Sequence, residues 1–119
     1  MYRYFTEEEF GQGKCSPACS LSDMSPIFMA RLDEARHIAG VPFVVNSAYR
    51  SKQYEIEKGR KGTSSHTKGI AVDLACTSNF NRLLIVESLI KVGFRRIGIG
   101  KTFIHVDNDS QKSPSIWLY

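Results

Sequence analysis

The order of helix and strand patterns along the chain is the feature that most constrains its fold. Runs rich in β-branched and aromatic residues, typical of strands, occur at positions 43–49, 70–75, 94–99 and 103–106. Helical patterns separate some of these runs, but the last two are joined only by a turn over 98–101. Because strands and helices do not alternate strictly, the pattern predicts an α+β domain, with helices packed on one face of a small, largely antiparallel sheet.

The helices are delimited by their capping residues. Ser25 is expected to cap a helix that has Pro26 at its first position and Gly40 just past its end. A second helix is predicted over 78–92 and a third, short one over 51–58. The apolar positions expected on the inner side are Phe28, Leu32, Ala35 and Ala39 in the first helix and Phe80, Leu83, Leu84, Val86, Leu89 and Ile90 in the second.

Length and charge narrow the class of protein. The 119 residues fit a single domain over 1–119, in which positions 1–24 form an irregular N-terminal arm with a short capped turn after Thr6. The net charge of +4 gives a mildly basic surface that suits an anionic polymer. The chain has no basic stripe interleaved with aromatic residues, and no stretch of about 20 apolar residues. We therefore expect a monomer that binds neither nucleic acid nor a membrane.

The three cysteines, Cys15, Cys19 and Cys76, do not indicate a disulfide framework, because their number is odd. Cys15 and Cys19 have the spacing of a zinc half-site, but the chain offers no second cysteine pair to complete it. Cys76 ends an apolar strand and is expected to be a small buried hydrophobic residue. Structural roles are predicted for all three.

Polar residues interrupt two of the apolar strands in a regular way. Asp73 lies inside the strand over 70–75, where a carboxylate is costly to bury without a paired cation or several donors. Because side chains alternate along a strand, Asp73 points away from the face of Val72, and His105 and Asp107 share one face of their own strand. If the two strands are neighbours, Asp73 and His105 point to a common place, over which His66 can close from a polar loop.

Two imidazoles and one carboxylate are a common set of zinc ligands, with the fourth position left for a water molecule that zinc activates. A histidine in a strand is more often an ordinary core or surface residue, so the spacing alone leaves both interpretations open. The remaining histidine, His37, falls on the polar side of the helix over 25–40 and is expected to be a surface residue.

These segments resemble a known family. The segment His66-Thr-Lys-Gly-Ile-Ala-Val-Asp73, followed by Phe103-Ile-His-Val-Asp107, is similar to the zinc-dependent D-alanyl-D-alanine carboxypeptidases and related peptidoglycan peptidases. The N-terminal segment Tyr4-Phe-Thr-Glu-Glu-Glu-Phe10 is also similar to short phage-type members. Their fold is shared with the hedgehog signalling domain. Upstream, Asn46-Ser-Ala-Tyr-Arg-Ser51 resembles the family's Ser-x-Tyr-Arg-Ser segment. The resemblance spans roughly 43–119 and implies that His66, Asp73 and His105 bind Zn²⁺.

The resemblance also implies an activity: hydrolysis of a peptide bond next to a D-amino acid in the stem peptides of bacterial peptidoglycan, by a D-Ala-D-Ala carboxypeptidase or an endolysin-type endopeptidase. Arg50 would lie near the developing oxyanion or hold a substrate carboxylate, with an ordinary surface ion pair as the alternative. Ser64 would offer its hydroxyl to the substrate, although loops of this composition are usually only solvated.

The sequence departs from the family at the general base. Many members carry an acidic residue shortly before the last zinc-binding histidine, and positions 99–104 contain none. Asp107, about 7 Å from His105 along the strand, is the nearest candidate. We favour a role in orienting His105, alone or combined with that of a base. A catalytically inactive, zinc-containing binding module of the same fold is the alternative function.

The first ten residues lack the apolar core of a secretory signal. Together with the resemblance, this predicts a lysin of phage or prophage type, which is made in the cytoplasm and acts on the cell wall after release.

Overall fold

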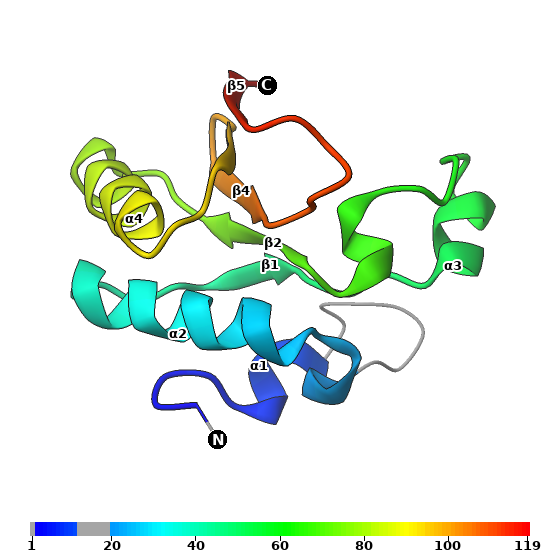
Figure 1. Ribbon diagram of the computed structural model, residues 1–119, viewed down its shortest axis with the longest axis horizontal. Helices are drawn as coiled ribbons and strands as arrows, with labels where there is room; N and C mark the ends of the chain where they lie inside the picture. The colour runs from blue at the N-terminus through cyan, green and yellow to red at the C-terminus, as the bar shows by residue number, and fades with distance from the viewer. Residues whose placement is uncertain (1, 12–19) are drawn as a thin grey trace.

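The structure, a computed structural model, describes residues 2–11 and 20–119 and is an α+β fold, as predicted (Figure 1). Cys15 and Cys19 lie outside the described residues. The elements in chain order are α1 (Glu7–Gly11), the 3₁₀ turn η1 (Leu21–Asp23), α2 (Pro26–Ala39), β1 (Val45–Ser47), α3 (Lys52–Glu57), the 3₁₀ turn η2 (Ser65–Lys68), β2 (Ala71–Ala75), α4 (Asn79–Lys91), β3 (Arg96–Ile99), β4 (Phe103–Asp107) and β5 (Ser115–Leu118).

The sheet is largely antiparallel, as the sequence predicts. Its strands lie in the order β1-β2-β4-β3-β5, and only the β3–β5 pair is parallel. The edge strand β5 was not predicted. The predicted strand over 43–49 is shorter in the structure and covers only Val45–Ser47. Gly98, predicted in the turn, lies inside β3, where it pairs with His105 of β4 on one side and Trp117 of β5 on the other.

Helices α2 and α4 pack against each other and cover one face of the sheet (Figure 1). Ser25 caps α2 by accepting a hydrogen bond from the Phe28 amide at 3.3 Å, and Gly40 follows its end. The apolar residues predicted for α2 are all buried. They join the inner face of the sheet in one core, whose buried strand members are Val45, Val72, Leu74, Ile97, Ile104 and Val106. The opposite face of the strands carries Asp73, His105 and Asp107.

Fewer of the predicted apolar residues of α4 face the core than expected. Leu89 is fully buried, but Phe80, Leu83 and Ile90 are more than half exposed. Ile85, which was not predicted to face the core, is buried in their place. The reason is that α4 lies at the edge of the domain (Figure 1), so that only one stripe of the helix meets the core.

The described part of the N-terminal arm contains α1 and η1, so it has more regular structure than predicted. The capped turn after Thr6 is present: the Thr6 amide donates to Glu9 Oε1 at 3.2 Å. The carboxylate of Asp33 in α2 holds the start of the arm by accepting from the Tyr4 amide at 2.9 Å. Cys76 is buried, as predicted. None of the helices in the described ranges has the length and apolar character needed to cross a membrane.

Candidate metal centre

The outer face of the sheet carries a row of aligned residues that positions the centre. Asp73 of β2 is directly opposite His105 of β4, and His105 is opposite Gly98 of β3. His105 and Asp107 share this face, which confirms the predicted alternation. The distance from His105 Nδ1 to Asp73 Oδ1 is 2.9 Å. Strand pairing alone therefore places one imidazole and one carboxylate in contact.

His66 reaches the same point from η2. Its Nε2 lies 3.5 Å from Asp73 Oδ1, and its ring packs edge-on against that of His105 with 5.3 Å between centroids. The turn closes through Gly69, where a Cβ atom would lie 2.2 Å from the carbonyl oxygen of Asp23. Only glycine fits there, and this close approach anchors the polar loop that carries His66.

The three side chains have the geometry of a metal site. One ligand atom from each of His66, Asp73 and His105 lies within 4.8 Å of the others. The second nitrogen of each ring is held: His66 Nδ1 is 2.7 Å from the Ala48 carbonyl oxygen, and His105 Nε2 is 2.7 Å from Asp107 Oδ2. An imidazole that donates to these acceptors directs the lone pair of its other nitrogen toward Asp73. Two nitrogen ligands and a carboxylate suit zinc.

Electrostatics supports a cation at this point. Burial by itself raises the pKa of Asp73, but hydrogen bonds from His105 and His66 outweigh it and hold the pKa well below its usual range. Burial likewise disfavours a charged His105, but its hydrogen bonds to Asp107 and Asp73 outweigh that effect and raise the pKa of the imidazole. Two carboxylates thus favour a positive charge at this point, which a bound metal ion would supply.

Asp107 has both carboxylate oxygens engaged. Oδ2 faces His105, whereas Oδ1 accepts from Arg96 Nε at 2.8 Å and from the Asp109 amide at 3.0 Å. Burial raises the pKa of Asp107, but these hydrogen bonds, chiefly that of His105, lower it overall. The geometry thus favours the predicted orienting role, and a role as general base stays a prediction.

Arg50 and Ser64 line the same pocket as the three candidate ligands, together with Trp117, Tyr119 and Phe103. Arg50 Nε donates to Glu55 Oε2 at 2.9 Å, and the Ser64 hydroxyl donates to the same oxygen at 2.6 Å. Because Glu55 is fully buried, this is not the ordinary surface ion pair that the sequence left open. Arg50 Nη2 makes no hydrogen bond within the described residues. Ser64 serves to fix Glu55.

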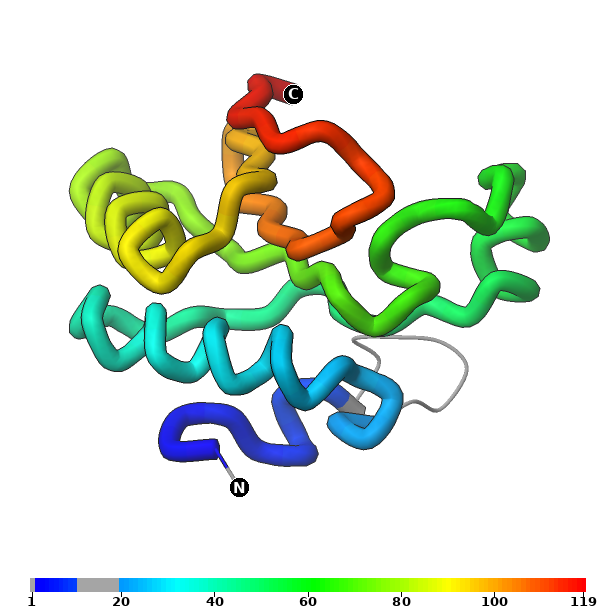
Figure 2. The backbone as a smooth tube through the Cα atoms, viewed as in Figure 1, coloured from blue at the N-terminus to red at the C-terminus, as the bar shows by residue number. Residues whose placement is uncertain are grey.

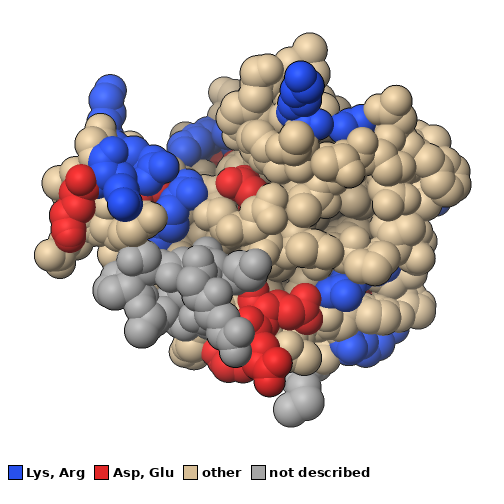
Figure 3. Space-filling model, turned by 180° about the vertical axis from the view of Figure 1, so that it is seen from behind, with Lys and Arg blue, Asp and Glu red and all other residues tan. Residues whose placement is uncertain are grey.

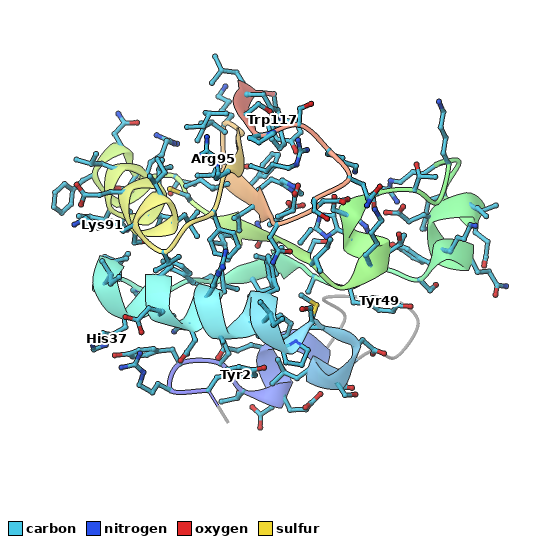
Figure 4. All side chains as sticks on the ribbon, viewed as in Figure 1. Tyr2, His37, Tyr49, Lys91, Arg95 and Trp117 are labelled. Carbon is cyan, nitrogen blue, oxygen red and sulfur yellow. The ribbon has the colours of Figure 1, made fainter. Side chains whose placement is uncertain are left out.

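The part of the pocket that follows β4 was not predicted from the sequence. Trp117 of β5 lies on the sheet beside His105, with 5.5 Å between ring centroids, and the guanidinium of Arg96 stacks over it at 4.8 Å. Figure 4 shows Trp117 at the end of the molecule opposite His37, which is exposed on α2 as predicted. The available signal was Gly98: a Cβ there would lie 2.7 Å from Trp117 and 2.6 Å from Tyr119, so the missing side chain makes room for both rings.

Comparison with known proteins gives one family. A search of curated proteins finds no significant match. Residues 3–107 match the family described as peptidase M15. The matched range includes the three candidate ligands and Asp107, and it ends before β5. The match covers most of the chain, and the chain therefore belongs to the peptidase M15 family.

Proposed function

We propose that the protein is a zinc-dependent peptidase that hydrolyses peptide bonds next to D-amino acids in bacterial peptidoglycan, as a carboxypeptidase or an endopeptidase. The observation that carries the proposal is the arrangement of His66 Nε2 and His105 Nδ1. Both face Asp73 Oδ1, and the opposite nitrogen of each ring is held by a buried acceptor. Family membership supports the peptidase chemistry.

The chemistry that zinc supplies when bound in such a site is the activation of water and the polarisation of the scissile carbonyl. The chain's own residues do the positioning. The carbonyl of Ala48 and the carboxylate of Asp107 hold the protons on the outer nitrogens of the two histidines. The guanidinium of Arg50, fixed by Glu55 and by Ser47 Oγ at 2.9 Å, presents Nη2 to a developing oxyanion.

One observation favours the alternative, an inactive zinc-containing binding module. The described carboxylates that line the pocket are Asp73 and Asp107, and both are already engaged with histidines. A pocket without a free carboxylate lacks an obvious general base. Digestion of purified peptidoglycan separates the two functions, because a binding module retains zinc but releases no product.

The test is digestion of purified peptidoglycan, with the soluble fragments identified by mass spectrometry. The zinc-loaded protein is expected to release stem-peptide fragments or D-Ala, a chelator to stop the reaction, and added zinc to restore it. Asp73→Ala should abolish release, whereas His37→Ala, a change at the remaining histidine, should not. A folded, zinc-loaded protein that releases no fragment would overturn the proposal.

The mass of the products separates a cut at the D-Ala-D-Ala end from a cut within the stem or cross-link. That the protein reaches the wall after release from inside the cell, as a lysin does, stays a prediction, as does its monomeric state.

A further inference from the structure

Three cationic side chains line the pocket, and the fold neutralises two of them. Arg50 Nε is 2.9 Å from a carboxylate oxygen of Glu55, and Arg96 Nε is 2.8 Å from one of Asp107. Both carboxylates are almost completely buried, so each arginine faces a fixed counter-charge. These two guanidinium groups therefore add shape and hydrogen-bond donors to the pocket, but little net charge.

The third cation, Lys112, is the one whose counter-charge also pairs with a second ammonium group. Lys68 Nζ contacts both oxygens of Asp109, at 3.0 and 3.2 Å. Lys112 Nζ lies 3.7 Å from Asp109, and its hydrogen bond, at 3.1 Å, goes to Ser65 Oγ. That hydroxyl donates to Asp109 at 2.8 Å. Two ammonium groups thus face one carboxylate, which leaves one positive charge in excess.

Of these two lysines, Lys112 is the one that lines the pocket. It belongs to the loop between β4 and β5, which runs beside the segment around η2 (Figure 2). Its hydrogen-bond partner, Ser65, directly precedes His66, so the ammonium group is held at the rim of the candidate metal centre. Because 38% of the Lys112 side chain is exposed, a ligand in the pocket can reach the ammonium group.

We propose that Lys112 binds a free carboxylate of the substrate and makes the enzyme prefer acidic peptides over their amides. This inference rests on the proposed function, which supplies the reaction, hydrolysis of a peptide bond in a stem peptide. An unneutralised ammonium group beside a pocket forms a charge-assisted hydrogen bond with a carboxylate, and an amide in the same place offers no charge. In a stem peptide such a carboxylate is either the C-terminal one or the free α-carboxylate of a γ-linked D-glutamate.

The test uses four synthetic stem peptides of sequence L-Ala-γ-D-Glu-L-Lys-D-Ala-D-Ala: the free acid, the two forms amidated at one carboxylate, and the doubly amidated form. Their affinities for the zinc-loaded protein are measured by calorimetry, and products in the same samples by mass spectrometry. The variants are Lys112→Met, Lys112→Arg and, as a matched control, Lys91→Met. Lys91 is exposed on α4, on a different side of the molecule from Trp117 (Figure 4).

The free acid is expected to bind about 10-fold to 100-fold more tightly than the peptide amidated at the recognised carboxylate. The singly amidated peptide that binds more weakly shows whether Lys112 recognises the C-terminal or the D-glutamate carboxylate. Lys112→Met should bring the ratio close to 1, whereas Lys112→Arg and Lys91→Met should keep it. Lys68 and Ser65 still hold Asp109 in these variants, so the loop is expected to remain folded.

The inference fails if the wild type binds the four peptides equally or binds none of them, or if Lys112→Met keeps the preference. The two proposals fail in different ways. A preference that depends on Lys112 without any cleavage would contradict the proposed function and leave the inference standing. Cleavage of all four peptides at equal rates, with equal affinities, would contradict the inference and support the proposed function.

Discussion

His105 is the residue on which most of the centre depends, because both of its ring nitrogens are committed. Nδ1 faces Asp73, and Nε2 faces a carboxylate that Arg96 holds from the other side. The ring therefore has a single orientation and a single tautomer for metal binding. The same is true of His66, which is fixed by a backbone carbonyl that no side-chain substitution removes. A side-chain substitution can therefore remove the acceptor that holds His105, but not the one that holds His66.

Asp107→Ala is predicted to weaken zinc binding about 10-fold to 100-fold, because His105 loses the acceptor that fixes its tautomer. Asp107→Asn, which keeps an acceptor oxygen, should lower the affinity less. Competition with a chromophoric chelator measures both. Glu34→Gln is the control, since Glu34 pairs with Arg3 in an exposed ion pair. Loss of activity with unchanged zinc affinity would instead assign Asp107 as the general base.

Asp109 gives a prediction about acid stability. Burial raises its pKa, but hydrogen bonds from Ser65, Lys68 and the Gln111 amide outweigh this and lower the pKa to about 2. A carboxyl group whose pKa is depressed on folding stabilises the protein above its unfolded pKa, near 4, and loses that contribution as the pH falls toward 2. Because both lysine partners are more than one-third exposed, we expect about 1 kcal/mol rather than the full value of the shift.

The comparison to make is between the wild type and Asp109→Asn by urea unfolding at pH 7, 4 and 2.5. The variant should be less stable by about 1 kcal/mol at pH 7, and the difference should shrink as the pH falls. A difference in the free energy of unfolding that stays constant with pH would mean that packing, and not charge, gives Asp109 its role.

At the scale of the elements, strand alternation was enough to predict the face shared by Asp73 and His105. It could not predict β5, because β5 pairs in parallel with β3 and depends on contacts between distant parts of the chain. Lys112 and Asp109 were missed for the same reason: their partners, Ser65 and Lys68, lie more than forty positions earlier. Periodicity reports which face a residue occupies, and not which loop closes over it.

Gly98→Ala tests whether β5 is placed by the absence of a side chain. The new Cβ would overlap the rings of Trp117 and Tyr119, so the end of β5 must move outward. We expect a loss of about 1–3 kcal/mol in the free energy of unfolding. Because Trp117 is the only tryptophan in the chain, its fluorescence emission should shift to longer wavelength as the ring enters water.

Ser115→Ala is the matched control, since it changes an exposed side chain of the same strand. It should alter neither the emission nor the stability. If Gly98→Ala leaves the emission of Trp117 unchanged, β5 is held by its backbone pairing alone, and the contact with Gly98 is not what positions the ring beside His105.

At the scale of the whole molecule, one group of exposed basic side chains stands out on the face drawn in Figure 3. Basic side chains gather at the end that carries α3 and the loop after it, where Lys58, Arg60 and Lys61 are exposed (Figure 3). If this end holds the protein on an anionic wall polymer, reversing the charge of these three residues should reduce sedimentation with purified walls. High salt should have the same effect on the wild type. Binding that resists salt would exclude this electrostatic mechanism.

The three candidate ligands come from η2, β2 and β4, so a bound metal ion links the polar loop to the centre of the sheet. A ligand that binds only the folded protein stabilises it by mass action, by about 2.7 kcal/mol at 100 times its Kd. For a domain of this size that corresponds to a rise in Tm of roughly 5–15 °C. Zinc is therefore predicted to raise the Tm of the chelator-treated protein, and Asp73→Asn to abolish the rise, whereas His37→Asn should keep it. Differential scanning calorimetry with and without zinc measures the shift, and an equal rise in Asp73→Asn would place the metal away from His66 and His105.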